Sequence, residues 1–225
     1  MIKNRQNWLN MNNNLSFYTD RSETQKTAFE LIAFGITNIK RAKVIRYINQ
    51  IEKYILEGSY LDHEILSDLI FEHLVDNIRI ILFFENYMKA VLIKKGFCVH
   101  NLKKEKDEYR ILAESQYNKP ISIHEIRAAT DLKNISDLNG HFLKGLKSTT
   151  VNFSTLLSKN YCSFNNLDED LILSLKNISK DRNKLHFNNH TEFYFSPKKI
   201  ALIKKIASFV DQQNEVLIRI QNSSI

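Results

Sequence analysis

The chain has 225 residues, of which 43% are hydrophobic and 25% charged, and this composition predicts a folded protein with one sizeable core. Five Gly and two Pro are far fewer than Gly-rich, collagen-like or Pro-rich disordered chains contain, so long helices are favoured. The net charge of +7 is compatible with a phosphate-rich partner, although charge alone identifies none.

Hydropathy and the cysteines bear on location. The best apolar run, Ile80–Phe84, lies between Arg79 and Glu85 and is far shorter than the roughly 18 residues of a membrane span. The Asn-rich N-terminus lacks the apolar core of a secretory signal. Cys98 and Cys162 lack metal-ligand spacing, and we interpret them as reduced core residues. We therefore expect a cytoplasmic protein that does not enter a membrane.

A first long helix is predicted after an N-terminal arm at residues 1–21. Ser22-Glu23-Thr24-Gln25 has the form of a capping box, in which the Ser hydroxyl and the Gln side chain each satisfy a backbone amide. Apolar residues then recur at three- to five-residue steps from Phe29 as far as Gly58, a C-cap residue type.

A second long helix is predicted from Asp62, which suits an N-cap, to Lys94-Lys95-Gly96. Cations followed by Gly fit the negative end of a helix dipole and a left-handed C-cap. Residues 78–84 are apolar on nearly all sides, so this helix is expected at the centre of the fold.

The middle of the chain, about 101–165, is predicted to be an insertion of two or three short helices. A second capping box stands at Ser122-Ile123-His124-Glu125, and Asn139-Gly140 indicates a turn.

Two further helices follow the insertion. One is expected to begin at Asn166 or Asp168 and to carry the apolar stripe Leu171, Leu175, Ile178 and Leu185; the last opens at Ser196-Pro197 and runs to about residue 221. The sequence therefore predicts one all-α domain over 1–225, a helical bundle of about five main helices with the short-helix insertion in its middle.

Arg182 and His186 are the residues with the clearest chemical potential. On a helix, positions i and i+4 share a face, so a guanidinium and a titrating imidazole would project together. This pairing suits RNA cleavage, because neutral His can accept the 2′-hydroxyl proton while Arg stabilises charge on the phosphate. Asn183 would add a hydrogen bond. A chance Arg-x-x-x-His is expected about 0.3 times in such a chain, so the pair needs further context.

That context is provided by three segments in order along the chain: residues 85–92 (ENYMKAVL), 96–102 (GFCVHNL) and 182–187 (RNKLHF). Together they resemble the HEPN superfamily, compact all-α domains of which many members are metal-independent ribonucleases. The resemblance extends over roughly residues 24–220. Two departures stand out: three residues separate Arg182 from His186 where the family has four to six, and Asn188 occupies the position of a Tyr that some members modify.

The resemblance implies a metal-independent endoribonuclease that cleaves tRNA or mRNA by 2′-hydroxyl attack and needs no cofactor. It further implies a bacterial toxin or anti-phage defence effector, acting as a homodimer and held in check by an antitoxin or defence-complex partner. The implied site residues are Arg182 and His186 for catalysis, Asn183 and Lys184 for substrate binding, and Glu85 and Lys89 in support.

Other interpretations stay open. The shortened motif also fits a catalytically inactive HEPN-like module that binds RNA, a nucleotide or a protein in a defence or toxin–antitoxin complex, and an unrelated helical adaptor would carry the pair by chance. Glu85 and Lys89 also fit an ordinary i,i+4 ion pair, and His100 a structural histidine. Six cations either guide an RNA backbone or simply face solvent: Lys40, Arg41, Lys43, Arg46, Lys94 and Lys95.

Overall fold

The computed structural model describes residues 18–40, 49–53, 63–104, 107–130, 144–184 and 197–222. Of these, 76% are helical, which confirms a largely helical fold. The chain divides into two compact units: unit 1 contains Met1–Leu31 and Tyr87–Asn166, and unit 2 contains Ile32–Asn86 and Leu167–Ile225. The prediction of a single domain stays a prediction.

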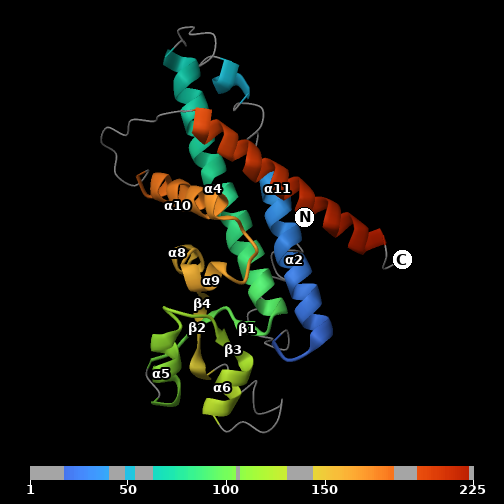
Figure 1. The fold of residues 1–225 in the computed structure, drawn as a ribbon, viewed down its shortest axis with the longest axis vertical. Helices are drawn as coiled ribbons and strands as arrows, with labels where there is room; N and C mark the ends of the chain where they lie inside the picture. The colour runs from blue at the N-terminus through green and yellow to red at the C-terminus, as the bar shows by residue number, and fades with distance from the viewer. Residues whose placement is uncertain are drawn as a thin grey trace. The chain divides into compact units, whose positions relative to one another are not determined.

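Helices and strands follow one another along the chain as Figure 1 shows. The helices are α2 (Arg21–Lys40), α4 (His63–Lys94), α5 (Asp107–Ser115), α6 (Ile123–Ala129), α8 (Phe153–Leu156), α9 (Lys159–Cys162), α10 (Glu169–Lys184) and α11 (Pro197–Asn222), and residues 49–53 are also helical. The strands are β1 (Phe97–Cys98), β2 (His100–Leu102), β3 (Ile121–Ser122) and β4 (Leu146–Thr150).

The start of α2 differs from the predicted one. The carboxylate of Asp20 accepts the amide of Glu23 at 2.9 Å, and the Asp20 carbonyl accepts the Thr24 hydroxyl at 2.7 Å. Asp20 therefore caps the helix, and the predicted capping box at Ser22 was wrong by two residues. The predicted continuation of this helix falls partly on residues 41–48 and 54–58, which lie outside the described residues.

The end of α4 confirms the prediction. The helix ends at Lys94, and Gly96 adopts φ +80°, a left-handed conformation that Gly reaches without a Cβ penalty. The amide of Gly96 donates to the carbonyl of Ile93 at 2.9 Å, which closes the last turn.

Unit 1 adds two antiparallel strand pairs, which the sequence did not predict, to the short helices in the middle of the chain. β1 pairs with β3, and β2 pairs with β4 through His100 opposite Thr150 and Leu102 opposite Leu146. These strands have two to five residues, too few for an alternating hydrophobic pattern to reveal them in the sequence. The described part of this region contains four short helices, α5, α6, α8 and α9, where the sequence predicted two or three.

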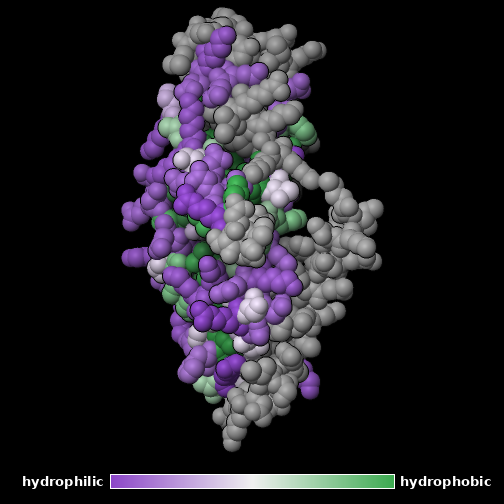
Figure 2. All heavy atoms as spheres, turned by 90° about the vertical axis from the view of Figure 1, so that its right-hand side faces the viewer, coloured by the Kyte–Doolittle hydropathy of each residue, from purple (hydrophilic) through white to green (hydrophobic). Residues whose placement is uncertain are grey.

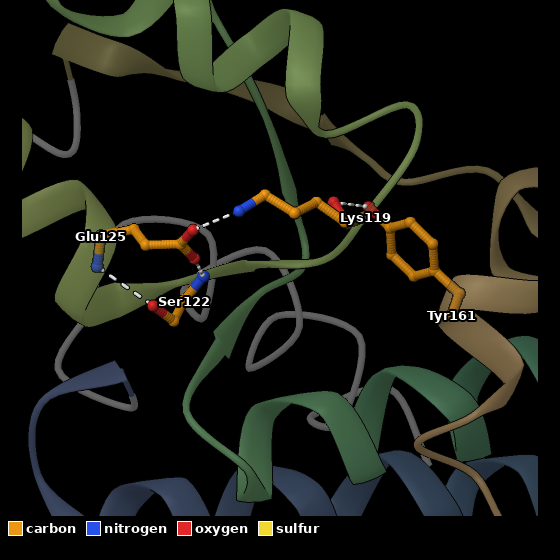
Figure 3. Close-up of polar contacts among 4 residues, drawn as sticks. All are labelled: Lys119, Ser122, Glu125 and Tyr161. Carbon is orange, nitrogen blue, oxygen red and sulfur yellow. Dashed lines mark hydrogen bonds and ion pairs between the residues drawn. The ribbon is translucent and has the colours of Figure 1, made fainter.

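A polar cluster connects α6 and α9 to the segment between α5 and α6 (Figure 3). The predicted capping box of α6 is confirmed, with the Glu125 amide donating to Ser122 Oγ at 3.0 Å and the Ser122 amide donating to Glu125 Oε2 at 2.7 Å. Lys119 Nζ pairs with Glu125 Oε1 at 2.6 Å, and the Tyr161 hydroxyl of α9 lies 3.2 Å from the Lys119 carbonyl. The residues between α5 and α6 are thus held from both sides.

Unit 2 is built from the second half of α2, the first part of α4, and α10 and α11. Phe83 and Phe84 on α4 are fully buried and contact Phe209 of α11, with ring centroids 6.4 Å and 5.4 Å apart. A Cβ on Gly35 of α2 would lie 3.2 Å from the Phe83 Cα, so Gly permits the close approach of these two helices. Lys204 of α11 pairs with Glu52 of the 49–53 stretch.

The two C-terminal helices begin as the sequence predicted. Asp168 Oδ1 accepts the Leu171 amide at 2.8 Å and so caps α10, while Lys205 of α11 lies 2.9 Å from the same carboxylate. The hydrogen bond from Lys205, followed by that from Leu171, lowers the pKa of Asp168. Leu171, Leu175 and Ile178 are buried as expected; Leu185 and Ser196 lie outside the described residues.

Hydrophilic residues cover much of the described surface on the face drawn in Figure 2. In the described part of the chain, no helix combines the length and hydropathy that crossing a membrane requires.

Candidate functional site

The described part of the predicted catalytic segment, residues 182–184, lies at the C-terminal end of α10 (Figure 1). The helix extends from Glu169 to Lys184, so Arg182, Asn183 and Lys184 belong to its last turn. His186 lies outside the described residues. The pairing of Arg182 with His186 therefore stays a prediction.

The predicted supporting residues, Glu85 and Lys89, are both in α4 but belong to different units. Glu85 is partly exposed and belongs to unit 2, which also contains α10. Lys89 is 8% exposed, and its Nζ donates to Thr150 Oγ1 of β4 at 2.7 Å. Within unit 1, Lys89 thus connects α4 to the β2–β4 pair, while a supporting role for either residue in catalysis stays a prediction.

Unit 1 contains a buried polar centre around Tyr18. Its hydroxyl lies 2.7 Å from Nδ1 of His100 and accepts the amides of Val99 at 3.0 Å and His100 at 3.3 Å. Cys98 Sγ lies 3.7 Å from the same oxygen. Tyr18 is 8% exposed and Cys98 fully buried, so these groups satisfy one another in place of water.

This arrangement determines the protonation of His100. The Tyr18 oxygen accepts two amides, so its single proton is donated to Nδ1 of His100, and the neutral imidazole carries its own proton on Nε2. Burial, and then the charge of Lys89, lower the pKa of His100 to about 4. At neutral pH His100 is therefore an uncharged acceptor, which agrees with its interpretation as a structural histidine.

Gln116 of the turn after α5 completes the same centre. Its Nε2 donates to the His100 carbonyl at 2.8 Å, and its Oε1 accepts the Leu102 amide at 3.0 Å. Burial raises the pKa of Cys98 to about 11, so this thiol is not ionised at neutral pH and is a poor nucleophile. Cys98 and Cys162 are both buried with free thiols, as predicted. The geometry of this centre is that of a structural anchor for β2.

In unit 2, α4 carries a second group of buried polar residues. His73, Asp76 and Asn77 are at most 2% exposed, although they occupy an amphipathic helix. Asn77 Nδ2 lies 3.2 Å from His73 Nε2, and Arg79 Nη1 lies 2.8 Å from Asp76 Oδ1. A carboxylate and an imidazole are thus buried in the same unit as α10.

Sequence reasoning missed Tyr18, Gln116 and the buried part of α4. The signal for His73, Asp76 and Asn77 was their position on a helix predicted to be central, where polar residues must find partners. No local pattern pointed to Tyr18 or Gln116, because their partners are distant in sequence.

The predicted basic cluster is only partly described. Lys94 and Lys95 are exposed at the end of α4, and Lys95 Nζ lies 5.6 Å from the ring centroid of Phe164. The side chain of Lys40 and residues 41–48 lie outside the described residues.

Among the described residues, no group of three or more His, Cys, Asp or Glu side chains is placed to hold a metal ion. Comparisons with protein-family models, curated proteins and solved structures found no match for this chain.

Proposed function

We propose that this chain is a HEPN-like, metal-independent endoribonuclease with Arg182 and His186 as its catalytic residues. The observation that carries the proposal is the regular helical geometry of α10 up to Lys184, which includes Arg182 and Asn183. If the helical path continues for two residues, His186 follows Arg182 by one turn on the same face. The resemblance of residues 85–92, 96–102 and 182–187 to HEPN proteins supports the assignment.

In this proposal α2, α4, α10 and α11 are main helices of a HEPN-like bundle of about five, and residues 49–53 belong to the predicted continuation of the first helix. Residues 101–165 then form the insertion, in which strand pairs accompany the short helices. The protein would act in the cytoplasm as a homodimer, so that two Arg182–His186 pairs face each other across a twofold axis. An antitoxin or a defence-complex protein would control it.

The chemistry needs one base, one acid and charge stabilisation. Neutral His186 accepts the 2′-hydroxyl proton and O2′ attacks phosphorus. The P–O5′ bond then breaks as the His186 imidazolium returns that proton to the leaving O5′. The products are a 2′,3′-cyclic phosphate and a 5′-hydroxyl. Arg182 stabilises the additional charge on the phosphate through its two-pronged guanidinium, and Asn183 and Lys184 bind the phosphate. Glu85, in the same unit, would orient Arg182.

Cleavage assays test the proposal directly. We expect purified protein to cleave tRNA or mRNA in EDTA, and equally folded Arg182→Ala and His186→Ala variants to lose this activity. Lys176→Ala is the matched control, because Lys176 is an exposed cation earlier on the same helix, α10. RNA binding without cleavage by the parent would overturn the nuclease and indicate the inactive binding module. If the parent neither binds nor cleaves RNA, the result indicates the unrelated helical adaptor.

A further inference from the structure

The positive charge of the described residues is concentrated in unit 1. There, thirteen Lys and Arg accompany seven Asp and Glu, whereas the described residues of unit 2 contain twelve of each. Two segments of unit 1 joined by the β2–β4 pair, residues 87–104 and 144–166, contain eight Lys and no Asp or Glu. Lys89 is buried, and because no carboxylate in these segments opposes the other seven lysines, they favour a polyanionic ligand.

The outer face of the β2–β4 pair carries polar side chains. His100 and Leu102 of β2 are buried, and Asn101 between them is partly exposed, at the register irregularity between β2 and β4. Asn101 Nδ2 donates to Thr149 Oγ1 at 3.1 Å and to the Thr150 carbonyl at 2.9 Å. Within the described parts of the chain, nothing donates to Oδ1 of Asn101, which leaves an acceptor for a ligand.

A cavity of about 30 Å³ lies beside this face, and Asn101, Gln116, Tyr117, Lys147 and Asn152 contribute to its lining. Its volume accommodates a small polar group but not a nucleobase. Tyr117 is 60% exposed, and Lys104 Nζ lies 5.1 Å from its ring centroid. An exposed aromatic ring thus lies close to a cation, and a second lysine, Lys147, lines the same cavity.

The backbone that carries Tyr117 is held on several sides. Gln116 bonds through its side chain to β2, while its carbonyl accepts the Tyr161 hydroxyl at 2.6 Å. Asn160 Nδ2 donates to the Asn118 carbonyl at 2.6 Å, and the Lys119–Glu125 pair follows (Figure 3). The aromatic ring therefore projects from a turn whose position is fixed before any ligand binds, which reduces the entropic cost of binding.

We propose that the surface formed by Asn101, Lys104, Tyr117 and Lys147, here called the Tyr117 surface, binds single-stranded nucleic acid. One base stacks on the Tyr117 ring, Lys104 and Lys147 bind the flanking phosphates, and Asn101 Oδ1 accepts a base N–H. Stacking on an aromatic ring between lysines is the general mode by which proteins hold unpaired strands. This surface belongs to unit 1 and the Arg182 segment to unit 2, and the inference goes beyond the proposed ribonuclease activity.

Fluorescence anisotropy with labelled 12-nucleotide strands tests this binding without cleavage. The probes are 2′-O-methyl oligouridine, which has no free 2′-hydroxyl to attack the phosphate, and oligothymidine, so binding is measured whether or not the chain is a nuclease. We expect both single strands to bind more tightly than a duplex of equal length, because paired bases cannot stack on Tyr117. Comparison of the two strands identifies the preferred sugar.

Variants separate stacking from charge. Tyr117→Ala is expected to weaken binding about fivefold or more, and Tyr117→Phe to stay within about twofold, because stacking needs only the ring. Lys104→Gln with Lys147→Gln should reduce the slope of log K against log salt by about 1.4, because each phosphate that a lysine neutralises on a single strand contributes about 0.7. Unchanged thermal midpoints show that these surface variants are folded.

The charge-matched control is Lys26→Gln with Lys198→Gln, which removes two exposed lysines elsewhere. This control should leave the salt slope unchanged. Three results would each overturn the Tyr117 surface. They are an equal reduction of the salt slope in both double variants, an unaltered affinity of Tyr117→Ala, and tighter binding of the duplex than of the single strands. All variants are compared in an Arg182→Ala background, so that a strand bound at the proposed nuclease site does not contribute to the measured affinity and the two proposals can fail separately.

Discussion

The hydroxyl of Tyr18 lies 2.7 Å from Nδ1 of His100, although 82 residues separate them in the sequence. This hydrogen bond joins the segment before α2 to strand β2. Strand β2 carries Asn101, which belongs to the Tyr117 surface. Because the hydroxyl also accepts two backbone amides, one side chain satisfies three buried polar groups.

Tyr18→Phe should destabilise the protein by about 1–3 kcal/mol, because two buried amides and one imidazole nitrogen lose their hydrogen bonds to the Tyr18 hydroxyl while the ring is kept. Urea unfolding followed by circular dichroism measures the change. Tyr117→Phe is the control, since the exposed hydroxyl of Tyr117 should contribute less than about 0.5 kcal/mol. Equal unfolding midpoints for parent and Tyr18→Phe would contradict the buried network.

The lowered pKa of His100 predicts a loss of stability in mild acid. The unfolded chain takes up a proton on His100 near pH 6.5, whereas the folded chain does so only near pH 4, so protonation favours unfolding between these values. The contribution of neutral His100 to the free energy of unfolding is complete above pH 6.5 and decreases as the pH falls toward 4. It amounts to about 2 kcal/mol between pH 7.5 and 5, from 1.36 kcal/mol per pKa unit.

His100→Gln tests this dependence, because Gln keeps an acceptor for the Tyr18 hydroxyl but does not titrate. The free energy of unfolding should fall less steeply with acid in this variant than in the parent. Parallel curves for the two proteins between pH 7.5 and 5 would show that other groups cause the acid sensitivity.

Gly145 and Gly96 should respond in opposite ways to the same substitutions. A Cβ on Gly145 would lie 2.4 Å from Cζ of Tyr109, a residue that is 1% exposed, so Gly145→Ala should cost about 1–3 kcal/mol and Gly145→Asn more. At Gly96 nothing lies within 4 Å and only φ +80° is restrictive, so Gly96→Asn should be tolerated better than Gly96→Ala. Thermal unfolding of the four variants measures these changes in stability. The same order of Ala and Asn at both positions would contradict the prediction.

If the chain is the proposed ribonuclease, Arg182→Lys should lower kcat about 100-fold or more, although the charge is kept. A lysine ammonium cannot form the two parallel hydrogen bonds that a guanidinium donates to a phosphate in the transition state. Steady-state cleavage of a labelled RNA measures the effect, with Lys180→Arg, one turn from Lys184, as a control expected to stay within about twofold. Retention of full activity by Arg182→Lys would remove Arg182 from the mechanism.

The helix ends were the most predictable part of the fold. The capping box at Ser122, the cap at Asp168 and the stop at Gly96 each depend on residues within four positions of one another, so the sequence is sufficient to locate them. The error at Ser22 has the same origin, because Asp20 offers a competing cap two residues earlier and the structure uses that carboxylate.

By itself, the sequence determined the helical class, the positions of most helices and the burial of both cysteines, since periodicity and composition act locally along the chain. Only the tertiary structure revealed the strand pairs, the Tyr18–His100 hydrogen bond and the concentration of positive charge in unit 1. These features arise from residues tens of positions apart, whose partners are chosen by packing and by the need to satisfy buried polar groups.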